Sequence, residues 1–183
     1  MARRRFLVNF LKHPGVTGSI TPSSRFLVRK MVESLGDLDS CRCVVEFGAG
    51  EGCLTRYLEK RLPEGCKILS FEINKDLLDR VNCRNGNVIL VNDDVARLER
   101  YLKKYNIRNV DHVVSSLPLA QIRREDCLNL LSMVYRNLKD NGVYVQYQYS
   151  LLSKGLIESV FENVEVRFTP LNIPPAFIYV CRK

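Results

Sequence analysis

The 183-residue sequence lacks any run of about 18 apolar residues, the length that a helix needs to cross a bilayer. We therefore expect no membrane-spanning segment. The basic first residues also lack the small-residue cleavage site of a signal peptide. Internal repeats and low-complexity stretches are absent, and the hydrophobic fraction of 46% is typical of a soluble globular protein. A chain of this length favours a single core.

Cysteine patterns that bind metals are missing as well. The seven cysteines are scattered, and none forms a CxxC pair. An odd number of cysteines disfavours a disulfide framework, so free thiols in a reducing cytoplasm are the preferred interpretation. No metal site is expected.

Acidic residues are absent from positions 1–32, although the whole chain has 28 Lys and Arg and 20 Asp and Glu. Seven basic residues lie in that segment, which leaves 21 basic and 20 acidic residues elsewhere in a chain of net charge +8. A basic segment interleaved with apolar residues is typical of binding to an anionic membrane, with RNA contact or plain packing as alternatives. The predicted membrane-contacting residues are Arg3, Arg4, Arg5, Phe6, Leu7, Phe10 and Lys12.

After residue 40, short apolar runs alternate with amphipathic ones, which is the pattern of an α/β fold. The expected strands are residues 43–47, 67–73, 87–94, 111–117, 142–150, 164–169 and 176–182. The expected helices are residues 53–62, 74–82, 95–105, 124–142 and 151–161, preceded by one from about Arg25.

The ends of these elements carry local signals. Residues 21–24, Thr-Pro-Ser-Ser, predict a cap for the first helix, and Asn74 is a further expected N-cap. Asn141-Gly142 is expected to close the longest helix. Short connections imply parallel strands, except for the last two, which form a closing hairpin.

The strongest motif is Glu-Phe-Gly-Ala-Gly-Glu-Gly at residues 46–52, between the first strand and its helix. Glycines allow a tight turn and close backbone approach to a ligand, although such a loop also fits an ordinary helix cap. Glu46 suits the amino group of an amino-acid-like cofactor. Glu72, about 20 residues after the last glycine, suits ribose hydroxyls, and Asp93-Asp94 suits an adenine amine.

With Ser-Ser-Leu-Pro-Leu at 115–119, these residues resemble the class I S-adenosylmethionine-dependent methyltransferases over about residues 40–183. The resemblance implies an α/β fold with a Rossmann-like seven-stranded sheet in the order 3-2-1-4-5-7-6, whose seventh strand is antiparallel. It implies S-adenosylmethionine as cofactor, S-adenosylhomocysteine as product, and no metal. The cofactor-binding residues that it implies are Ser19, Thr21, Glu46, Gly48, Gly50, Gly52, Glu72, Ile73, Asp94, Val95 and Ser115.

The loop after the fourth strand bears on the substrate. Enzymes that methylate amines of bases resemble one another in having (Asn/Asp)-(Pro/Leu)-Pro-(Tyr/Phe) there. This chain has Ser116 in the polar position and Leu119 in the aromatic one. Loss of the ring removes stacking worth about 1–3 kcal/mol per base, which argues against an adenine substrate.

Residues 10–25, with Gly-Ser-Ile-Thr-Pro-Ser-Ser at 18–24, are similar to the bacterial phospholipid N-methyltransferases, as are residues 146–150 and 172–180. That family methylates phosphatidylethanolamine in steps up to phosphatidylcholine. We expect a cytoplasmic enzyme that is peripheral on the inner face of the cell membrane, and a monomer. Residues 1–39 would form a helical docking segment and lid, and residues 40–183 the catalytic domain.

Other activities remain open. The related ribosomal RNA adenine dimethylases share the layout, but they usually carry a helical domain after the sheet, whereas this chain ends at its last expected strand. An N-methyltransferase of another amino lipid or small amine, and a non-catalytic cofactor-binding protein, are further alternatives.

Methyl transfer to nitrogen requires an unprotonated amine in line with the methyl donor. The candidate catalytic residues are Tyr147, Tyr149 and Ser116, the last through a held water. Alternation places the two tyrosines on one strand face, where they either flank a cationic headgroup or pack as core. The candidate substrate-binding residues are Leu117, Pro118, Arg25 and Arg182, with the arginines directed at a lipid phosphate.

Overall fold

The computed structural model describes residues 24–84 and 86–183. The predicted membrane-contacting residues and two of the predicted cofactor-binding residues lie outside these ranges, namely Arg3, Arg4, Arg5, Phe6, Leu7, Phe10, Lys12, Ser19 and Thr21. Within the described ranges, no helix has the length and apolar character needed to traverse a bilayer.

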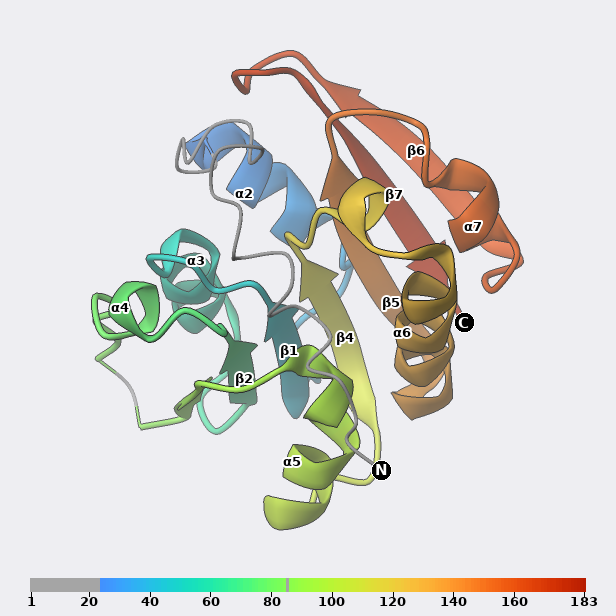
Figure 1. Ribbon diagram of the computed structural model, residues 1–183. Helices are drawn as coiled ribbons and strands as arrows, with labels where there is room; N and C mark the ends of the chain where they lie inside the picture. The colour runs from blue at the N-terminus through green and yellow to red at the C-terminus, as the bar shows by residue number, and fades with distance from the viewer. Residues whose placement is uncertain (1–23, 85) are drawn as a thin grey trace.

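Seven strands form one sheet in the order β3-β2-β1-β4-β5-β7-β6 (Figure 1). Strands β1 to β5 pair in parallel, and β7 runs antiparallel to both β5 and β6. This confirms the predicted order and the antiparallel seventh strand. The strands are β1 (Cys43–Phe47), β2 (Lys67–Phe71), β3 (Val88–Val91), β4 (Val110–Ser115), β5 (Leu138–Gln148), β6 (Asn163–Thr169) and β7 (Ala176–Arg182).

Helices cover both faces of the sheet. The α-helices are α2 (Arg25–Glu33), α3 (Cys53–Arg61), α4 (Lys75–Leu78), α5 (Leu98–Lys104), α6 (Arg124–Asn137) and α7 (Lys154–Glu158). Residues 24–84 and 86–183 also contain two 3₁₀ turns, η2 (Val95–Arg97) and η3 (Leu119–Gln121). Helices α2 and α3 pack on one face, and α5, α6 and α7 on the other.

The core is divided by the sheet because neighbouring residues of a strand point to opposite faces. Val44 and Val114 face α2 and α3, whereas Val45 and Val113 face the other helices. Burial on both faces explains why β1 and most of β2 are apolar. The same pattern makes the one charged residue of β1, Glu46, conspicuous.

The predicted helix 124–142 ends earlier, at Asn137, so the prediction that Asn141-Gly142 closes it is wrong. Leu138 already pairs with Val110 in the sheet, and the register of β5 shifts before Val143. Asn141 adopts a φ of 64° within that irregular stretch. Pairing of Leu138 with β4, and not the Asn-Gly pair, therefore determines where this helix ends.

The helix starts agree better with prediction. Ser24 caps α2 by accepting a hydrogen bond from the Leu27 N–H, and Asn74 caps α4. Besides the predicted helix 124–142, three more are shorter than expected: residues 74–82 yield only α4, 95–105 divide into η2 and α5, and 151–161 yield only α7.

Candidate functional site

The glycine-rich loop lies at the carboxyl end of β1, beside the ends of β2 and β4. Gly48, Gly50 and Gly52 all have positive φ, at 81°, 53° and 80°. A Cβ on Gly48 would lie 2.6 Å from the Ser116 hydroxyl, and one on Gly52 would lie 2.6 Å from Val81 Cγ1. Positive φ favours glycine at all three positions, and steric crowding adds to this at Gly48 and Gly52.

Glu46 lies fully buried under this loop. Its Oε2 accepts hydrogen bonds from Thr55 Oγ1 and Ser70 Oγ, both at 2.6 Å. Its Oε1 has no partner among the described residues. Burial raises the pKa of Glu46 to about 7, although the two hydroxyl donors act to lower it. The site therefore contains a carboxyl oxygen that a cationic group of a ligand would satisfy.

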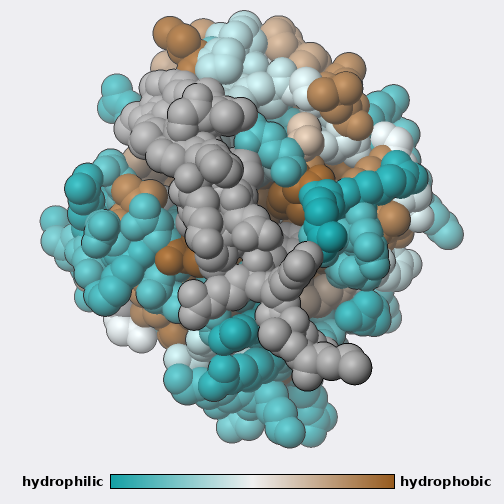
Figure 2. Space-filling view, viewed as in Figure 1, coloured by the Kyte–Doolittle hydropathy of each residue, from teal (hydrophilic) through white to brown (hydrophobic). Residues whose placement is uncertain are grey.

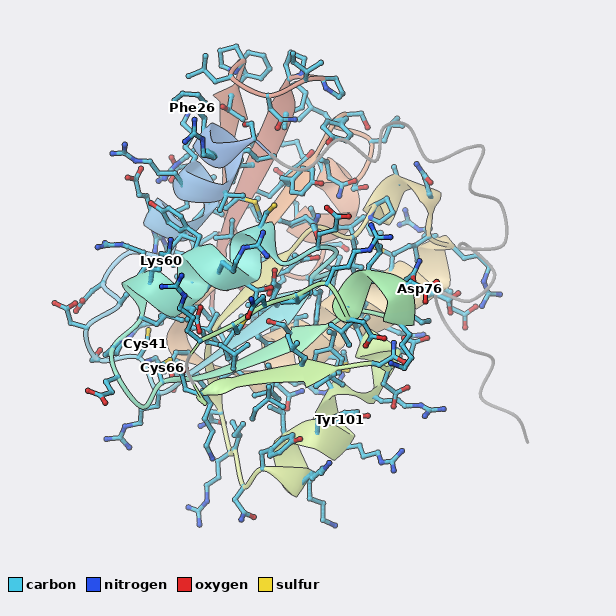
Figure 3. The ribbon with its side chains drawn as sticks, turned by 90° about the vertical axis from the view of Figure 1, so that its left-hand side faces the viewer. Phe26, Cys41, Lys60, Cys66, Asp76 and Tyr101 are labelled. Carbon is cyan, nitrogen blue, oxygen red and sulfur yellow. The ribbon has the colours of Figure 1, made fainter. Side chains whose placement is uncertain are left out.

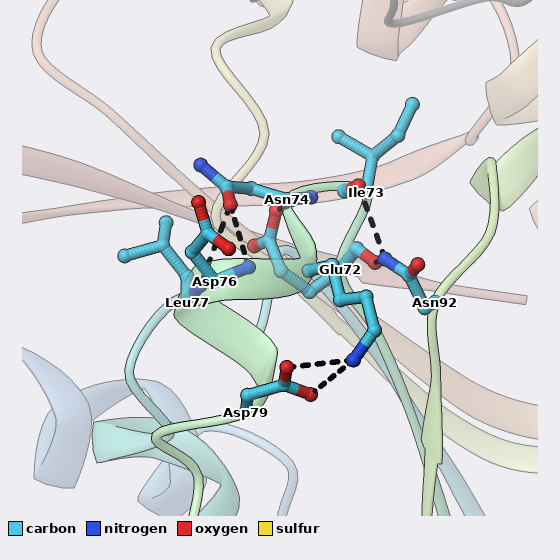
Figure 4. A network of polar contacts seen from close by, with 8 residues as sticks. Glu72, Ile73, Asn74, Asp76, Leu77, Asp79 and Asn92 are labelled. Atoms are coloured by element: carbon cyan, nitrogen blue, oxygen red, sulfur yellow. Dashed lines mark hydrogen bonds and ion pairs between the residues drawn. The ribbon is translucent and has the colours of Figure 1, made fainter.

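Glu72 follows β2 and joins the glycine loop to α4. One carboxylate oxygen accepts from the Gly50 N–H and the other from the Asn74 N–H, both at 2.9 Å. The Asn92 side chain donates to the Glu72 and Ile73 carbonyl oxygens, so β3 holds this corner as well (Figure 4). The half-buried Ile73 is thus fixed beside the predicted ribose-binding acid.

The two acids after β3 have different surroundings. Asp93 accepts hydrogen bonds from Tyr101 and Arg97, and these with the Asp94 N–H lower its pKa although burial acts to raise it. Asp94 is 4% exposed and accepts from the Ala96 N–H at the start of η2. Asp93 is thus engaged with α5, whereas Asp94 caps η2 beside the buried Val95.

Ser116 is bound to the glycine loop. Its hydroxyl donates to the Gly48 carbonyl oxygen at 2.6 Å and lies 3.1 Å from that of Phe47. It is half-buried at the end of β4, where the sequence predicts a catalytic water. Ser115 is fully buried and its hydroxyl accepts from the Leu117 N–H. The hydrogen bonds of both serines therefore stabilise the conformation of the loop that follows β4.

Two glutamine amides hold the next part of this loop. Gln146 and Gln148 on β5 donate to the Leu117 carbonyl oxygen at 3.0 and 2.7 Å. Leu119, in the aromatic position of the base-methylating enzymes, is 2% exposed, and Pro118 is partly exposed. The sequence predicts no such role for the glutamines. Their spacing of two residues on a buried strand is the signal that could have revealed it.

Tyr147 and Tyr149 meet beyond these amides. Their ring centroids lie 5.6 Å apart at an interplanar angle of 69°, which confirms the shared face. Tyr144 lies on the opposite face and donates its hydroxyl proton to Gln146 Oε1 at 2.7 Å. Tyr149 is 38% exposed and Tyr147 is half-buried.

The two candidate phosphate-binding arginines lie apart. Arg25 is exposed at the start of α2. Arg182 pairs with Val143, whereas the site-side end of β5 pairs with Phe177. Five residues of strand, about 17 Å, separate Arg182 from the carboxyl edge where the loops converge. The prediction that Arg182 binds the substrate is wrong, because β7 runs antiparallel and carries it to the opposite edge.

All seven cysteines are free thiols, as the sequence predicts. Burial raises the pKa of Cys43 to about 12 and that of Cys127 to about 11, so neither is a reactive thiolate at neutral pH. Within the described ranges, no group of three or more His, Cys, Asp or Glu side chains could hold a metal ion.

Comparison with known proteins agrees with this fold. The methyltransferase domain family matches residues 44–142. An ornithine lipid N-methyltransferase of Singulisphaera acidiphila is 32% identical over 181 residues, which cover 97% of this chain and 94% of that protein. A ribosomal RNA small subunit methyltransferase A of Mycoplasmopsis pulmonis is 29% identical over 63% of this chain and 41% of its own length.

Solved structures show the same fold. A precorrin-6y C5,15-methyltransferase of Geobacter metallireducens superposes with a TM-score of 0.68 at 18% identity, over 87% of this chain and 90% of its own. A methyltransferase from Streptococcus mutans, solved with S-adenosylhomocysteine, gives a TM-score of 0.58 at 17% identity over 86% and 95%. This chain belongs to the class I S-adenosylmethionine-dependent methyltransferases. Within that class, one relative that matches 97% of this chain is an ornithine lipid N-methyltransferase.

Proposed function

We propose that this protein transfers the methyl group of S-adenosylmethionine to the amine of a membrane amino lipid. The observation that carries the proposal is the likeness to an ornithine lipid N-methyltransferase along 97% of the chain. Ornithine lipid is therefore the first substrate to test. Phosphatidylethanolamine is the second, and its successive methylation would end at phosphatidylcholine.

The chain's own residues fit the cofactor. The unpartnered Oε1 of Glu46 would accept from its ammonium group, and the backbone of Gly48, Gly50 and Gly52 can approach it closely. Glu72 would bind the ribose hydroxyls beside Ile73. Asp94 and Val95 would bind the adenine, with Ser115 supporting the loop beside them. When bound, S-adenosylmethionine supplies an electrophilic methyl group on a sulfonium.

The substrate amine would lie between the Ser116 loop and the tyrosine pair. The rings of Tyr147 and Tyr149 would hold a cationic amine or its methylated product through their faces, which need no N–H donor. A water held by Ser116, or a tyrosine hydroxyl that passes its own proton to solvent, would take the amine proton. Leu117 and Pro118 would exclude bulk water, and the exposed Arg25 would bind the lipid phosphate.

We propose that the reaction takes place at the inner face of the cell membrane. The protein would bind there peripherally, as a monomer. The basic and apolar residues of positions 1–39 would dock and cover the site, and residues 40–183 would carry out catalysis. A positively charged apolar segment gains both from apolar burial and from attraction to anionic lipids.

The decisive experiment offers methyl-labelled S-adenosylmethionine with three acceptors in parallel: anionic vesicles containing ornithine lipid, the same vesicles containing phosphatidylethanolamine, and small-subunit ribosomal RNA. We expect label in an amino lipid. Label in the RNA and none in either lipid would overturn the proposal. Tyr149→Phe and Tyr149→Ala then separate loss of the hydroxyl from loss of the ring.

Methylation of ribosomal RNA adenine is the second candidate, because three ribosomal RNA small subunit methyltransferases A match between 48% and 63% of this chain. Those matches span only 31–41% of the relatives. Leu119 also leaves the loop after β4 without the ring on which a base would stack. The lipid reaction is therefore the one we favour.

A further inference from the structure

Large apolar side chains are exposed at eight described positions, and six of them occur in three segments at the carboxyl edge of the sheet. We call these six the apolar rim: Phe26, Leu151, Leu152, Phe168, Leu171 and Ile173. Leu152 and Ile173 are 84% and 82% exposed, which is unusual for residues that gain so much from burial. The other two exposed positions are Tyr149 and Leu90. Tyr149 of the candidate site adjoins the rim in sequence, whereas Leu90 lies on β3, the edge strand opposite β6.

Specific contacts fix the three segments of the apolar rim together. The Ser24 hydroxyl donates to the Leu171 carbonyl oxygen at 2.7 Å, and Lys30 Nζ donates to that of Phe168 at 2.9 Å, so α2 is tied to the β6–β7 connection. Tyr179 on β7 donates its hydroxyl proton to the Ser150 carbonyl oxygen at 3.3 Å, beside Leu151. The rim is therefore a single surface held by the fold.

The figures show the same arrangement. In Figure 1, α2 and the β6–β7 connection lie together at the top of the molecule, toward which β4 and β5 point. Figure 2 shows hydrophobic residues there, and Figure 3 shows Phe26 at the same end of the molecule. Since parallel strands of this class end at the cofactor site, the apolar rim and the site share one edge.

The three segments of the apolar rim contain basic but no acidic side chains, and Glu33, just beyond the first segment, pairs with Arg29. Residues 24–32, 149–157 and 168–181 contain no Asp or Glu. Their basic side chains include Arg25, Lys30 and Lys154 at or near the rim; Lys154 pairs with Glu158, just outside these stretches. Exposed apolar side chains with a basic margin match the chemistry of an anionic bilayer, where the side chains enter the acyl boundary and the cations meet phosphates.

We propose that the apolar rim inserts into the surface of an anionic bilayer and holds the carboxyl edge of the sheet against the lipid headgroups. In this orientation the exposed Tyr149 lies next to the inserted Leu151, so a headgroup amine reaches the tyrosine pair while its acyl chains stay in the bilayer. The inference rests on the proposed function for its purpose. It adds a second membrane contact, made by the folded domain and independent of the first 23 residues.

The test compares the full chain with its Leu152→Glu/Ile173→Glu variant in sedimentation with phosphatidylglycerol–phosphatidylethanolamine vesicles. We expect the variant to bind at least tenfold more weakly, with an unchanged unfolding temperature. Leu90→Glu is the control for an added glutamate at an exposed apolar residue away from the rim, with one new negative charge against the two of the rim variant. If the glutamates lower the unfolding temperature, Leu152→Ser/Ile173→Ser gives the comparison without added charge.

Equal vesicle binding by the wild type and the rim variant would overturn the inference. So would a wild-type dimer that the variant converts to a monomer without loss of vesicle binding, because the rim would then be an interface between copies of the chain. A water-soluble short-chain amino lipid separates this result from the proposed function. The variant should methylate it at the wild-type rate while losing activity on vesicles. Failure of the wild type on both forms of the lipid would overturn the proposed function alone.

Discussion

At the scale of single residues, Glu46 has the most unusual environment. It is fully buried in the middle of the sheet, two hydroxyls satisfy one carboxylate oxygen, and the other has no partner among the described residues. An unpaired buried carboxylate is costly unless a cation compensates it. The residue is therefore better suited to the cofactor-bound protein than to the free one.

Glu46→Gln should weaken S-adenosylhomocysteine binding about 10- to 100-fold at pH 8, because an ammonium group loses a charge-assisted hydrogen bond of about 1.5–3 kcal/mol. Titration calorimetry measures the affinity directly. Glu51→Gln is the control, since Glu51 is an exposed acid of the same loop that pairs with Arg80. Unchanged affinity in Glu46→Gln would show that this carboxyl does not contact the cofactor.

The loop glycines make a second residue-scale prediction. Gly48→Ala combines a positive φ with a Cβ placed 2.6 Å from the Ser116 hydroxyl, whereas Gly50→Ala meets no atom within 4 Å. We expect Gly50→Ala to cost about 1–2 kcal/mol of stability from backbone strain alone, and Gly48→Ala to cost more. Urea unfolding measures both. Adding Ser116→Ala to Gly48→Ala should recover part of the loss, and no recovery would argue against this contact.

At the scale of elements, the sequence predicts most strands well and the helix ends less well. The run from Cys43 to Phe47 is bounded by clear signals and is found intact. The longest helix illustrates the limit, since its apolar period continues to Leu138, but that residue pairs with Val110 on β4. A contact between residues far apart in sequence decides this end, and local patterns carry no information about it.

The candidate site shows the same division. Its glycines and the acids Glu46, Glu72 and Asp94 follow strand ends, so the motif and the class resemblance predict them. The two glutamine amides on the Leu117 carbonyl depend on β5 lying next to β4, which only the structure gives. Arg182 is different. The predicted antiparallel seventh strand already implies its place at the opposite edge, and following that strand's direction would have excluded it.

An element-scale prediction concerns the start of α2. The Ser24 hydroxyl accepts from the Leu27 N–H and donates to the Leu171 carbonyl oxygen, so it both caps the helix and anchors the β6–β7 connection. Ser24→Ala should cost about 1–2 kcal/mol in urea unfolding. Ser24→Thr keeps the hydroxyl and should cost much less. Equal losses in the two variants would contradict the capping role.

At the scale of the whole molecule, two buried titratable groups have opposite effects on how stability changes with pH. The pKa of Glu46 is raised from 4.5 to about 7, so the stability that its neutral form provides is lost as pH rises through that range. Burial lowers the pKa of His112 from 6.5 to about 4, so its contribution is present above pH 6.5 and is lost as pH falls. Each shift corresponds to about 3 kcal/mol, and between pH 4.5 and 6.5 the two slopes offset one another.

Removing either Glu46 or His112 should therefore reveal how the other group makes the free energy of unfolding depend on pH. Glu46→Gln should leave a protein whose stability falls steeply as pH drops from 6.5 to 4.5, and His112→Asn one whose stability falls as pH rises over the same range. The double variant should show a flatter profile than either single variant. Urea unfolding at several pH values measures all three, and parallel profiles for the single variants would refute the opposition.

The direction of β7 has one more consequence, for how the molecule can be observed. Because β7 runs against β5, Lys183 lies at the amino edge of the sheet, where its Nζ donates to the Leu138 carbonyl oxygen. A fluorophore attached beyond Lys183 would thus report from the side remote from the cofactor loops and the apolar rim. On a vesicle surface it would point to bulk water, and its energy transfer to a lipid dye would reveal which way up the protein sits.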